Sequence, residues 1–141
     1  MTQPSAHLPR GLRNNNPLNI RISNITWKGK IPIEDNRDGS FEQFDTIVNG
    51  LRAALVNIRV YIRKYHCNTP LTIIQRWAPA SDGNNTRAYI AKVCELTSLA
   101  PGRVLSFANR TEMCRLVWAM AFVECGQFLD IDLIYQAYAQ I

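Results

Sequence analysis

The sequence has little histidine and no clustered cysteine. Only two histidines occur in 141 residues, and no Cys-x-x-Cys pair is present among the four cysteines, Cys67, Cys94, Cys114 and Cys125. Zinc sites in proteins are usually built from such clusters. We therefore expect no metal site in this chain.

Long apolar stretches are also missing. The longest uncharged apolar run, residues 116–123, has eight residues, whereas a helix needs about 20 to cross a bilayer. Residues 1–10 contain Gln3, Pro4, His7 and Pro9 and lack the apolar centre of a secretory signal. We therefore expect the chain to have no membrane span and no signal peptide.

Acidic residues are outnumbered by basic ones, 11 to 16, which gives a net charge of +5. A basic surface favours polyanions such as nucleic acid, anionic lipid or an anionic cell wall. The alternative is a basic domain whose charge serves solubility alone.

The length fits one domain, and its patterns predict an α+β fold that is mostly helical. We expect a flexible tail over residues 1–9 and a single domain over residues 10–141. Apolar spacing predicts about five helices: residues 46–65 capped by Asp45, 70–78, 86–96, one from Asn109 or Thr111 to Cys125, and one capped by Asp130 that runs to about Ala139. Short extended pieces at residues 19–25 and 41–44 predict a small irregular β element.

Glu124 stands out because its surroundings do not suit a carboxylate. It is the only charged residue between Arg115 and Asp130, in a helix that is apolar nearly all round. Burial and the negative end of the helix dipole both favour its protonated form. A protonated carboxyl near neutral pH is what a general acid for glycosidic cleavage needs. The alternative is a glutamate that reaches solvent from a helix end.

Two sets of short motifs resemble known families. Residues 15–21 (Asn-Asn-Pro-Leu-Asn-Ile-Arg), 26–29 (Thr-Trp-Lys-Gly) and 41–45 (Phe-Glu-Gln-Phe-Asp) resemble the stretch that follows the catalytic glutamate in bacterial endo-β-N-acetylglucosaminidases. Residues 77–82 and 89–92 resemble two further motifs of that family, Tyr-Ala-Thr-Asp and Tyr-Ala-x-Lys. This resemblance implies activity on peptidoglycan.

The closer resemblance is to lysozyme-like virion structural proteins of phages and prophages. Residues 10–21 match their Arg-Gly-x-Arg-Asn-Asn-Asn-Pro-Gly-Asn-Ile-Arg opening except at Leu18, and residues 76–79 match Arg-Trp-Ala-Pro. Residues 84–89 loosely match Asn-x-Thr-x-x-Tyr. Residues 123–126 resemble their His-Glu-Asn-Gly segment, with Val123 and Cys125 replacing His and Asn. The resemblance implies a lysozyme-like domain.

The order of the motifs predicts a circular permutation. In the glucosaminidases Glu-x-Gly precedes the Asn-Asn motif, whereas here residues 124–126 come near the end of the chain. Domain termini often lie close together, so joining them would restore the order. We therefore expect Glu124 to face Asn15, Asn16 and Trp27 across one groove.

The resemblance assigns catalytic roles. Glu124 would protonate the glycosidic oxygen and Tyr89 would orient or stabilise the sugar, unless Tyr89 is an ordinary core residue. The family implies a single-glutamate mechanism, completed by the substrate's N-acetyl group or 6-hydroxyl, with no cofactor. A second carboxylate, if one is used, would come from Glu34, Asp35, Asp38 or Asp45, although acids in loops are usually solvated.

Substrate contacts are expected from aromatic and amide side chains. Trp27 and Trp77 could stack on sugar faces, with core packing as the alternative reading of Trp77. Asn15, Asn16 and Asn19 offer donors and acceptors for acetamido and hydroxyl groups, and their alternative role is in turns and caps.

The sequence thus predicts a peptidoglycan glycosidase of the muramidase, glucosaminidase or lytic transglycosylase type. The expected partners are peptidoglycan glycan strands and other virion proteins. Without a signal peptide, the protein would be made in the bacterial cytoplasm and reach the cell wall through a virion, a holin or a secretion machine. Two alternatives stay open: an inactive virion or envelope protein that binds glycan, and a nucleic-acid-binding module using the arginine row Arg52, Arg59 and Arg63.

Overall fold

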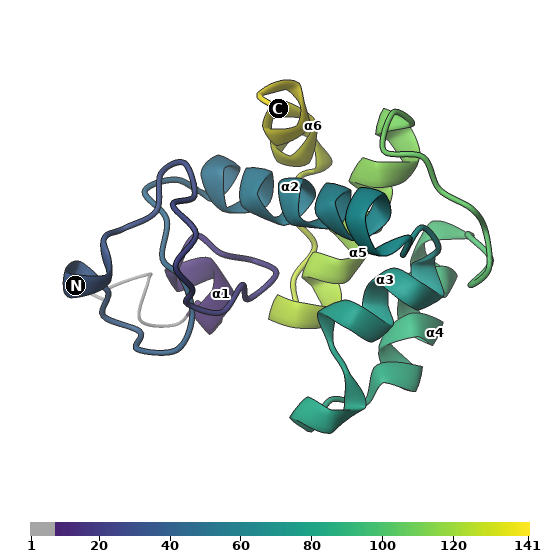
Figure 1. Ribbon diagram of the computed structural model, residues 1–141, viewed down its shortest axis with the longest axis horizontal. Helices are drawn as coiled ribbons and strands as arrows, with labels where there is room; N and C mark the ends of the chain where they lie inside the picture. Colours follow the sequence, from purple (N-terminus) through teal and green to yellow (C-terminus); the bar gives the residue numbers. More distant parts are fainter. Residues whose placement is uncertain (1–7) are drawn as a thin grey trace.

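The computed structural model describes residues 8–141, and this part of the chain is mostly helical (Figure 1). Its helices are α1 (Arg10–Arg13), α2 (Ile47–Tyr65), α3 (Pro70–Trp77), α4 (Thr86–Thr97), α5 (Arg110–Cys125) and α6 (Ile131–Ala139), with 3₁₀ turns η2 (Ile33–Asp35) and η3 (Ala80–Asp82). Residues 1–7 of the predicted tail lie outside the described residues. Pro9 belongs to the folded part, because its carbonyl accepts hydrogen bonds from the N–H groups of Leu12 and Arg13.

The five predicted helices are present, and two of the expected N-cap residues, Asn109 and Asp130, are confirmed. Asn109 and Asp130 accept backbone N–H groups at the starts of α5 and α6, and Gly126 ends α5 with φ of 76°. One cap was predicted wrongly. Thr46, not Asp45, caps α2 by accepting the Asn49 N–H, while Asp45 accepts the Asn49 side-chain amide.

The N-terminal region differs most from expectation. Residues 10–13, for which no helix was predicted, form the single turn of helix α1. Within residues 8–141 the two extended pieces pair at one isolated antiparallel bridge, Arg21 with Phe41, and a second isolated bridge joins Lys30 to Phe44. Positive φ angles at Asn15, Asn19, Gly29 and Gly39 break up any longer ladder.

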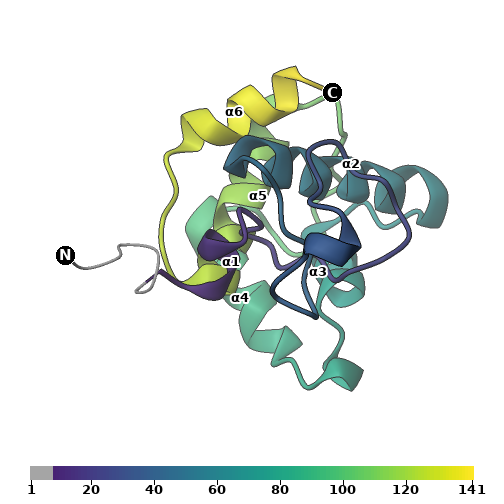
Figure 2. The same ribbon diagram turned by 90° about the vertical axis from the view of Figure 1, so that its left-hand side faces the viewer.

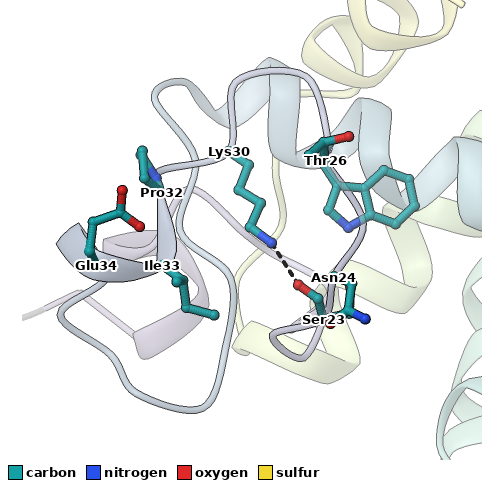
Figure 3. Close-up of a pocket in the computed structure, with 8 residues that line it drawn as sticks. Ser23, Asn24, Thr26, Lys30, Pro32, Ile33 and Glu34 are labelled. Carbon is teal, nitrogen blue, oxygen red and sulfur yellow. Dashed lines mark hydrogen bonds between the residues drawn. The ribbon is translucent and has the colours of Figure 1, made fainter.

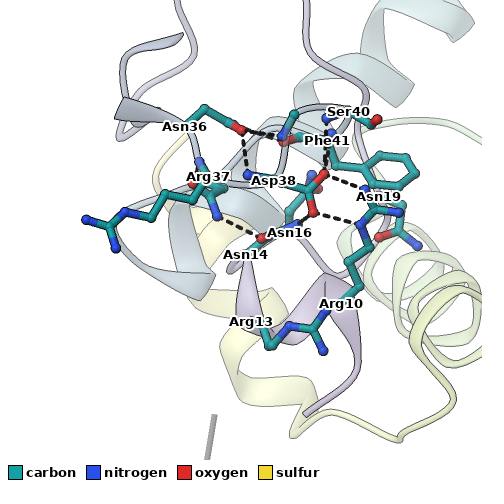
Figure 4. A network of polar contacts seen from close by, with 12 residues as sticks. Arg10, Arg13, Asn14, Asn16, Asn19, Asn36, Arg37, Asp38, Ser40 and Phe41 are labelled. Carbon is teal, nitrogen blue, oxygen red and sulfur yellow. Dashed lines mark hydrogen bonds and ion pairs between the residues drawn. The ribbon is translucent and has the colours of Figure 1, made fainter. Parts of the chain in front are cut away.

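Polar contacts replace a sheet in holding this region together (Figure 4). Asp38 accepts hydrogen bonds from Arg10 at 2.7 and 2.8 Å and from Asn14 at 3.0 Å, together with the backbone N–H of Phe41. The Arg10 guanidinium holds the pKa of Asp38 well below its usual range. Asp38 is therefore an anchor of the fold rather than a free acid.

Helix α5 forms the centre of the molecule. It contacts α1, α2, α4 and α6, and Figure 2 shows α1 beside it. Its apolar residues 116, 117 and 119–121 are buried, as a helix that is apolar all round requires. Figure 1 shows α2 running between the N-terminal region and the α3–α4 pair. Of the described helices, none combines the length and the apolar character that crossing a bilayer would need.

Gly50 lets α2 approach the asparagine turn at residues 14–16. A Cβ atom at this position would overlap the backbone carbonyl of Asn15. The close approach helps to fix the turn, from which the chain continues through the buried Leu18 to Asn19. A glycine inside α2 thus contributes to the placement of Asn19, despite its cost to the helix.

Candidate active site

Glu124 lies in the last turn of α5, with its carboxyl held by two side chains from distant parts of the chain. The Asn19 amide donates to Glu124 Oε1 at 3.1 Å, and the Tyr89 hydroxyl donates to Oε2 at 3.0 Å. Tyr89 comes from α4 and is buried, whereas Glu124 is half-buried. Three segments therefore meet at one carboxyl group.

Burial raises the pKa of Glu124 above its ordinary value. Hydrogen bonds from Asn19 and Tyr89 and the charge of Arg21 act in the opposite direction, but burial prevails. Burial and the nearby Glu124 carboxyl also raise the pKa of Tyr89 well above its usual value. Tyr89 therefore keeps its proton at neutral pH.

Tyr89 can serve both protonation states of Glu124. Its hydroxyl lies 3.0 Å from Glu124 Oε2 and 3.4 Å from the carbonyl of Met120. With Glu124 ionised, the hydroxyl donates to the carboxylate. With Glu124 protonated, it can accept the carboxyl proton and donate to Met120 instead.

Asn19 has a backbone conformation that favours asparagine. Its φ of 54° lies in the left-handed region, which asparagine tolerates better than most residues. Its buried Oδ1 has no hydrogen-bond partner within residues 8–141. A half-turn of the amide would present Oδ1 to Glu124 as an acceptor, so Asn19 too can serve a protonated carboxyl.

Glu124 borders two hollows in the surface. The Glu124 hollow, of about 90 Å³, is lined by Asn19, Arg21, Phe41, Trp77, Ala78, Asp82, Asn84 and Glu124. The Tyr89 hollow, of about 540 Å³, is lined by Asn84, Asn85, Ala88, Tyr89, Lys92, Phe122, Val123, Glu124 and Gly126. The carboxyl thus combines burial with access from the surface, which an acid catalyst requires.

Two more hollows extend the first one. The Trp77 hollow, of about 290 Å³, shares Asn19, Arg21, Trp77 and Asp82 with the Glu124 hollow. The Trp27 hollow, of about 430 Å³, shares Ser23 and Trp27 with the Trp77 hollow (Figure 3). Because successive hollows share lining residues, they adjoin one another past Glu124, and we call the four adjoining hollows the groove. A chain-like ligand would suit such a groove.

The two tryptophans predicted to bind sugar both line this groove. The Trp77 indole N–H donates to the carbonyl of Leu18 at 3.1 Å, and its ring meets Tyr61 edge-on. The indole nitrogen of Trp27 is buried and has no partner in the described part of the chain. Both rings are half-buried, so each combines packing with a surface toward the groove.

The asparagines separate into two groups. Asn15 donates its amide to the carbonyl of Phe44, and Asn16 donates to the carbonyls of Ile20 and Glu42. Neither is among the residues that line the four hollows. Asn19 alone of the three contacts Glu124.

None of the acidic residues considered for a second carboxylate lines the two hollows that Glu124 borders. Asp38 is paired with Arg10, Asp45 is bonded to Asn49, and Glu34 lines the Trp27 hollow. Asp35, in η2, is exposed. Asp82 was not considered, yet it lines the same hollow as Glu124. Its position next to the matched Trp-Ala-Pro motif was the available signal.

A buried ion pair in the N-terminal region was also missed. Glu42 is fully buried and pairs with Lys30 at 2.9 Å. Lys30 also donates to the carbonyl of Ser23 (Figure 3) and to that of Ile25. These two hydrogen bonds close the loop that contains Trp27. Nothing in the local sequence distinguishes Glu42 from a surface acid, because its burial depends on chain crossings far apart.

Residues 8–141 contain no group of three or more histidine, cysteine or acidic side chains arranged to hold a metal ion.

Comparison with known proteins links the chain to phages. It is 39% identical over 100 residues to Protein P5 of Pseudoalteromonas phage PM2. The aligned stretch covers 69% of this chain and 61% of the phage protein, so the chain spans about three fifths of that relative. No protein-family model matches. The similarity makes this a phage-related protein.

Proposed function

We propose that this protein cleaves the glycan strands of peptidoglycan, with Glu124 as the general acid. The observation that carries the proposal is the environment of the Glu124 carboxyl. This group is half-buried, accepts hydrogen bonds from Asn19 and Tyr89, and borders the groove. Its burial raises its pKa. A carboxyl with a raised pKa keeps its proton to higher pH than an ordinary glutamate does, and it can protonate a glycosidic oxygen as the bond breaks.

The mechanism uses one glutamate of the chain and a group of the substrate. Glu124 donates its proton to the leaving oxygen as the bond to the anomeric carbon breaks, and the N-acetyl oxygen or the 6-hydroxyl of the sugar forms the new bond to that carbon. The Glu124 carboxylate then takes a proton, either from the 6-hydroxyl as it closes the anhydro ring or from the water that opens the ring formed by the N-acetyl group, and this restores the acid. Tyr89 and Asn19 hold the carboxyl in place in both protonation states. Trp77 and Trp27 offer apolar ring surface to successive sugars along the groove.

We further propose a permuted lysozyme-like fold. The hydrogen bond between the Asn19 amide and the Glu124 carboxyl supports this proposal, because the two residues are 105 positions apart in the chain. That bond brings the Asn-rich motif beside the Glu-x-Gly motif, in the arrangement that the reversed motif order requires.

The setting we propose is a phage or prophage particle. Similarity to a phage protein supports it, and a virion or a lysis pathway would bring the enzyme to the cell wall. Other virion proteins are then its partners. The net charge of +5 favours an anionic wall.

The decisive test compares the native chain with Glu124→Gln on purified peptidoglycan, by zymography and by release of soluble fragments. Glu95→Gln is the matched control, because Glu95 is an exposed acid of α4 whose one ion-pair partner within residues 8–141 is Lys92. We expect clearing by the native chain and by Glu95→Gln, and none by Glu124→Gln.

The failures of this test are informative. Equal clearing by the native chain and Glu124→Gln would refute the role of Glu124. No clearing with retained pelleting on cell walls would indicate a glycan-binding protein without activity. Salt-sensitive retardation of DNA, without wall binding, would favour the nucleic-acid-binding module.

A further inference from the structure

The groove contains two arginines without an acidic partner. Arg21 and Arg76 both line the Trp77 hollow, and neither forms an ion pair within residues 8–141. The two lysines along the groove differ in this respect, since Lys30 pairs with Glu42 and Lys92 with Glu95. The two guanidinium groups are thus the uncommitted cations of the groove in the described part of the chain.

Aromatic rings hold both guanidinium groups. Arg76 lies 3.5 Å from the centre of the Tyr65 ring and 5.2 Å from that of Tyr61. Arg21 lies 5.4 Å from the centre of the Phe41 ring. Such contacts orient the flat guanidinium over a ring and leave its N–H edge free for hydrogen bonds. An oriented fork of N–H donors matches the two oxygens of a carboxylate.

The charges that line the Trp77 hollow favour the binding of an anion. Asp82 lines the same hollow, so while the neighbouring Glu124 is protonated two positive groups face one negative group and one positive charge remains. Arg21 and Asp82 also line the Glu124 hollow. An anion bound here would therefore lie beside the sugar on which Glu124 acts.

We propose that Arg21 and Arg76 form a carboxylate-binding subsite, which selects glycan strands that carry acidic substituents over neutral ones. This inference rests on the proposed function and names its substrate class. In peptidoglycan the carboxylate is either the lactyl group of muramic acid or an acidic group of the stem peptide. The subsite thereby distinguishes peptidoglycan from neutral polymers of N-acetylglucosamine.

The test measures binding in the Glu124→Gln background, where the ligands are not consumed. Three probes separate the sources: chitotetraose, which has no carboxylate; glycan fragments stripped of peptides, which expose the lactyl carboxylate; and muropeptide oligomers, which carry the peptide acids. We expect at least one acidic probe to bind about tenfold more tightly than chitotetraose, as one charge-assisted contact provides.

Substitutions then locate the effect. Arg21→Gln and Arg76→Gln should each lower the affinity for the acidic probe several-fold and leave the affinity for chitotetraose unchanged. Asp82→Asn should raise the affinity for the acidic probe, because it removes the negative charge that opposes the anion. Arg63→Gln is the control for net charge, since Arg63 is an exposed residue of α2 outside all four hollows.

Each outcome decides one claim. Equal binding of acidic and neutral probes, or an equal loss in Arg63→Gln, would overturn the subsite and leave the proposed function standing. Binding of none of the three probes would overturn the proposed function itself. A short DNA duplex that binds more tightly than every glycan probe would assign the arginines to phosphate and overturn the subsite.

Discussion

The side-chain amide of Asn19 lies 3.1 Å from Oε1 of Glu124, although 105 positions separate the two residues in the chain. Both residues depend on unusual local structure. Asn19 has a left-handed backbone, and Glu124 precedes the glycine that ends α5. The contact therefore joins two chain positions whose geometry the local sequence already restricts.

Removal of the Asn19 side chain should impair the acid. In Asn19→Gly the left-handed backbone is retained at low cost, but the hydrogen bond to Glu124 is lost. Without that donor the pKa of Glu124 rises further, so the alkaline limb of the pH–rate profile moves to higher pH. We also expect the maximal rate to fall about tenfold as the carboxyl loses its orientation.

Asn15→Gly is the matched control for that experiment. Asn15 also has a left-handed backbone, with φ of 52°, but its amide bonds the carbonyl of Phe44. Its substitution should leave the alkaline limb in place. A limb that moves equally in both variants would show that the effect comes from the turn and not from the contact with Glu124.

Tyr89→Phe should shift the pH profile in the same direction. The hydroxyl hydrogen bond lowers the pKa of Glu124, so its loss raises that pKa and extends activity toward alkaline pH. Loss of this bond should also cost about 0.5–1.5 kcal/mol of unfolding free energy. Initial rates across the pH range, with urea unfolding of the same variant, measure both effects. An unmoved limb would place Tyr89 outside the acid's environment.

Glu124→Gln should stabilise the protein at neutral and alkaline pH. Because the folded state raises the pKa of Glu124, it holds the proton more tightly than the unfolded chain does. Native stability therefore falls as pH rises from the ordinary glutamate pKa to the folded one, with a slope of at most about 1.4 kcal/mol per pH unit. Glutamine has no such cost. Its advantage over the native chain should be absent in acid, grow through that window and then stay constant.

Unfolding of both proteins over a pH series tests this prediction, with Glu95→Gln as the exposed control. A difference that does not change with pH would mean that Glu124 has an ordinary pKa in the folded protein. In that case the raised pKa would be lost as an argument for a general acid, whatever the result of the cleavage assay.

The helices could be predicted from local pattern, since apolar spacing and cap residues such as Asn109 and Asp130 act within a few positions. Glu124 could be singled out for the same reason, as an acid in the last turn of an apolar helix. Both signals depend on neighbours in sequence, which any single chain displays.

The rest of the site depends on contacts between distant segments. Asp82 and Arg21 meet in one hollow only because η3 packs beside the N-terminal region. The buried ion pair of Glu42 with Lys30 and the pairing of Asp38 with Arg10 likewise depend on chain segments that cross one another. Such crossings leave no periodic pattern in the local sequence. For this reason the predicted β element proved to be two isolated bridges, supported by side-chain hydrogen bonds and ion pairs.

Gly50 offers the clearest test of how the groove is positioned, because its role is purely steric. In a helix, alanine normally stabilises relative to glycine by about 1 kcal/mol. Here the added Cβ would overlap the Asn15 carbonyl, so Gly50→Ala should instead destabilise the protein by about 1–3 kcal/mol or more. Gly102→Ala is the control, because a Cβ there meets nothing within 4 Å. Urea unfolding compares the two variants. If Gly50→Ala proved as stable as Gly102→Ala, α2 would not press against the asparagine turn, and the position of Asn19 beside Glu124 would need another support.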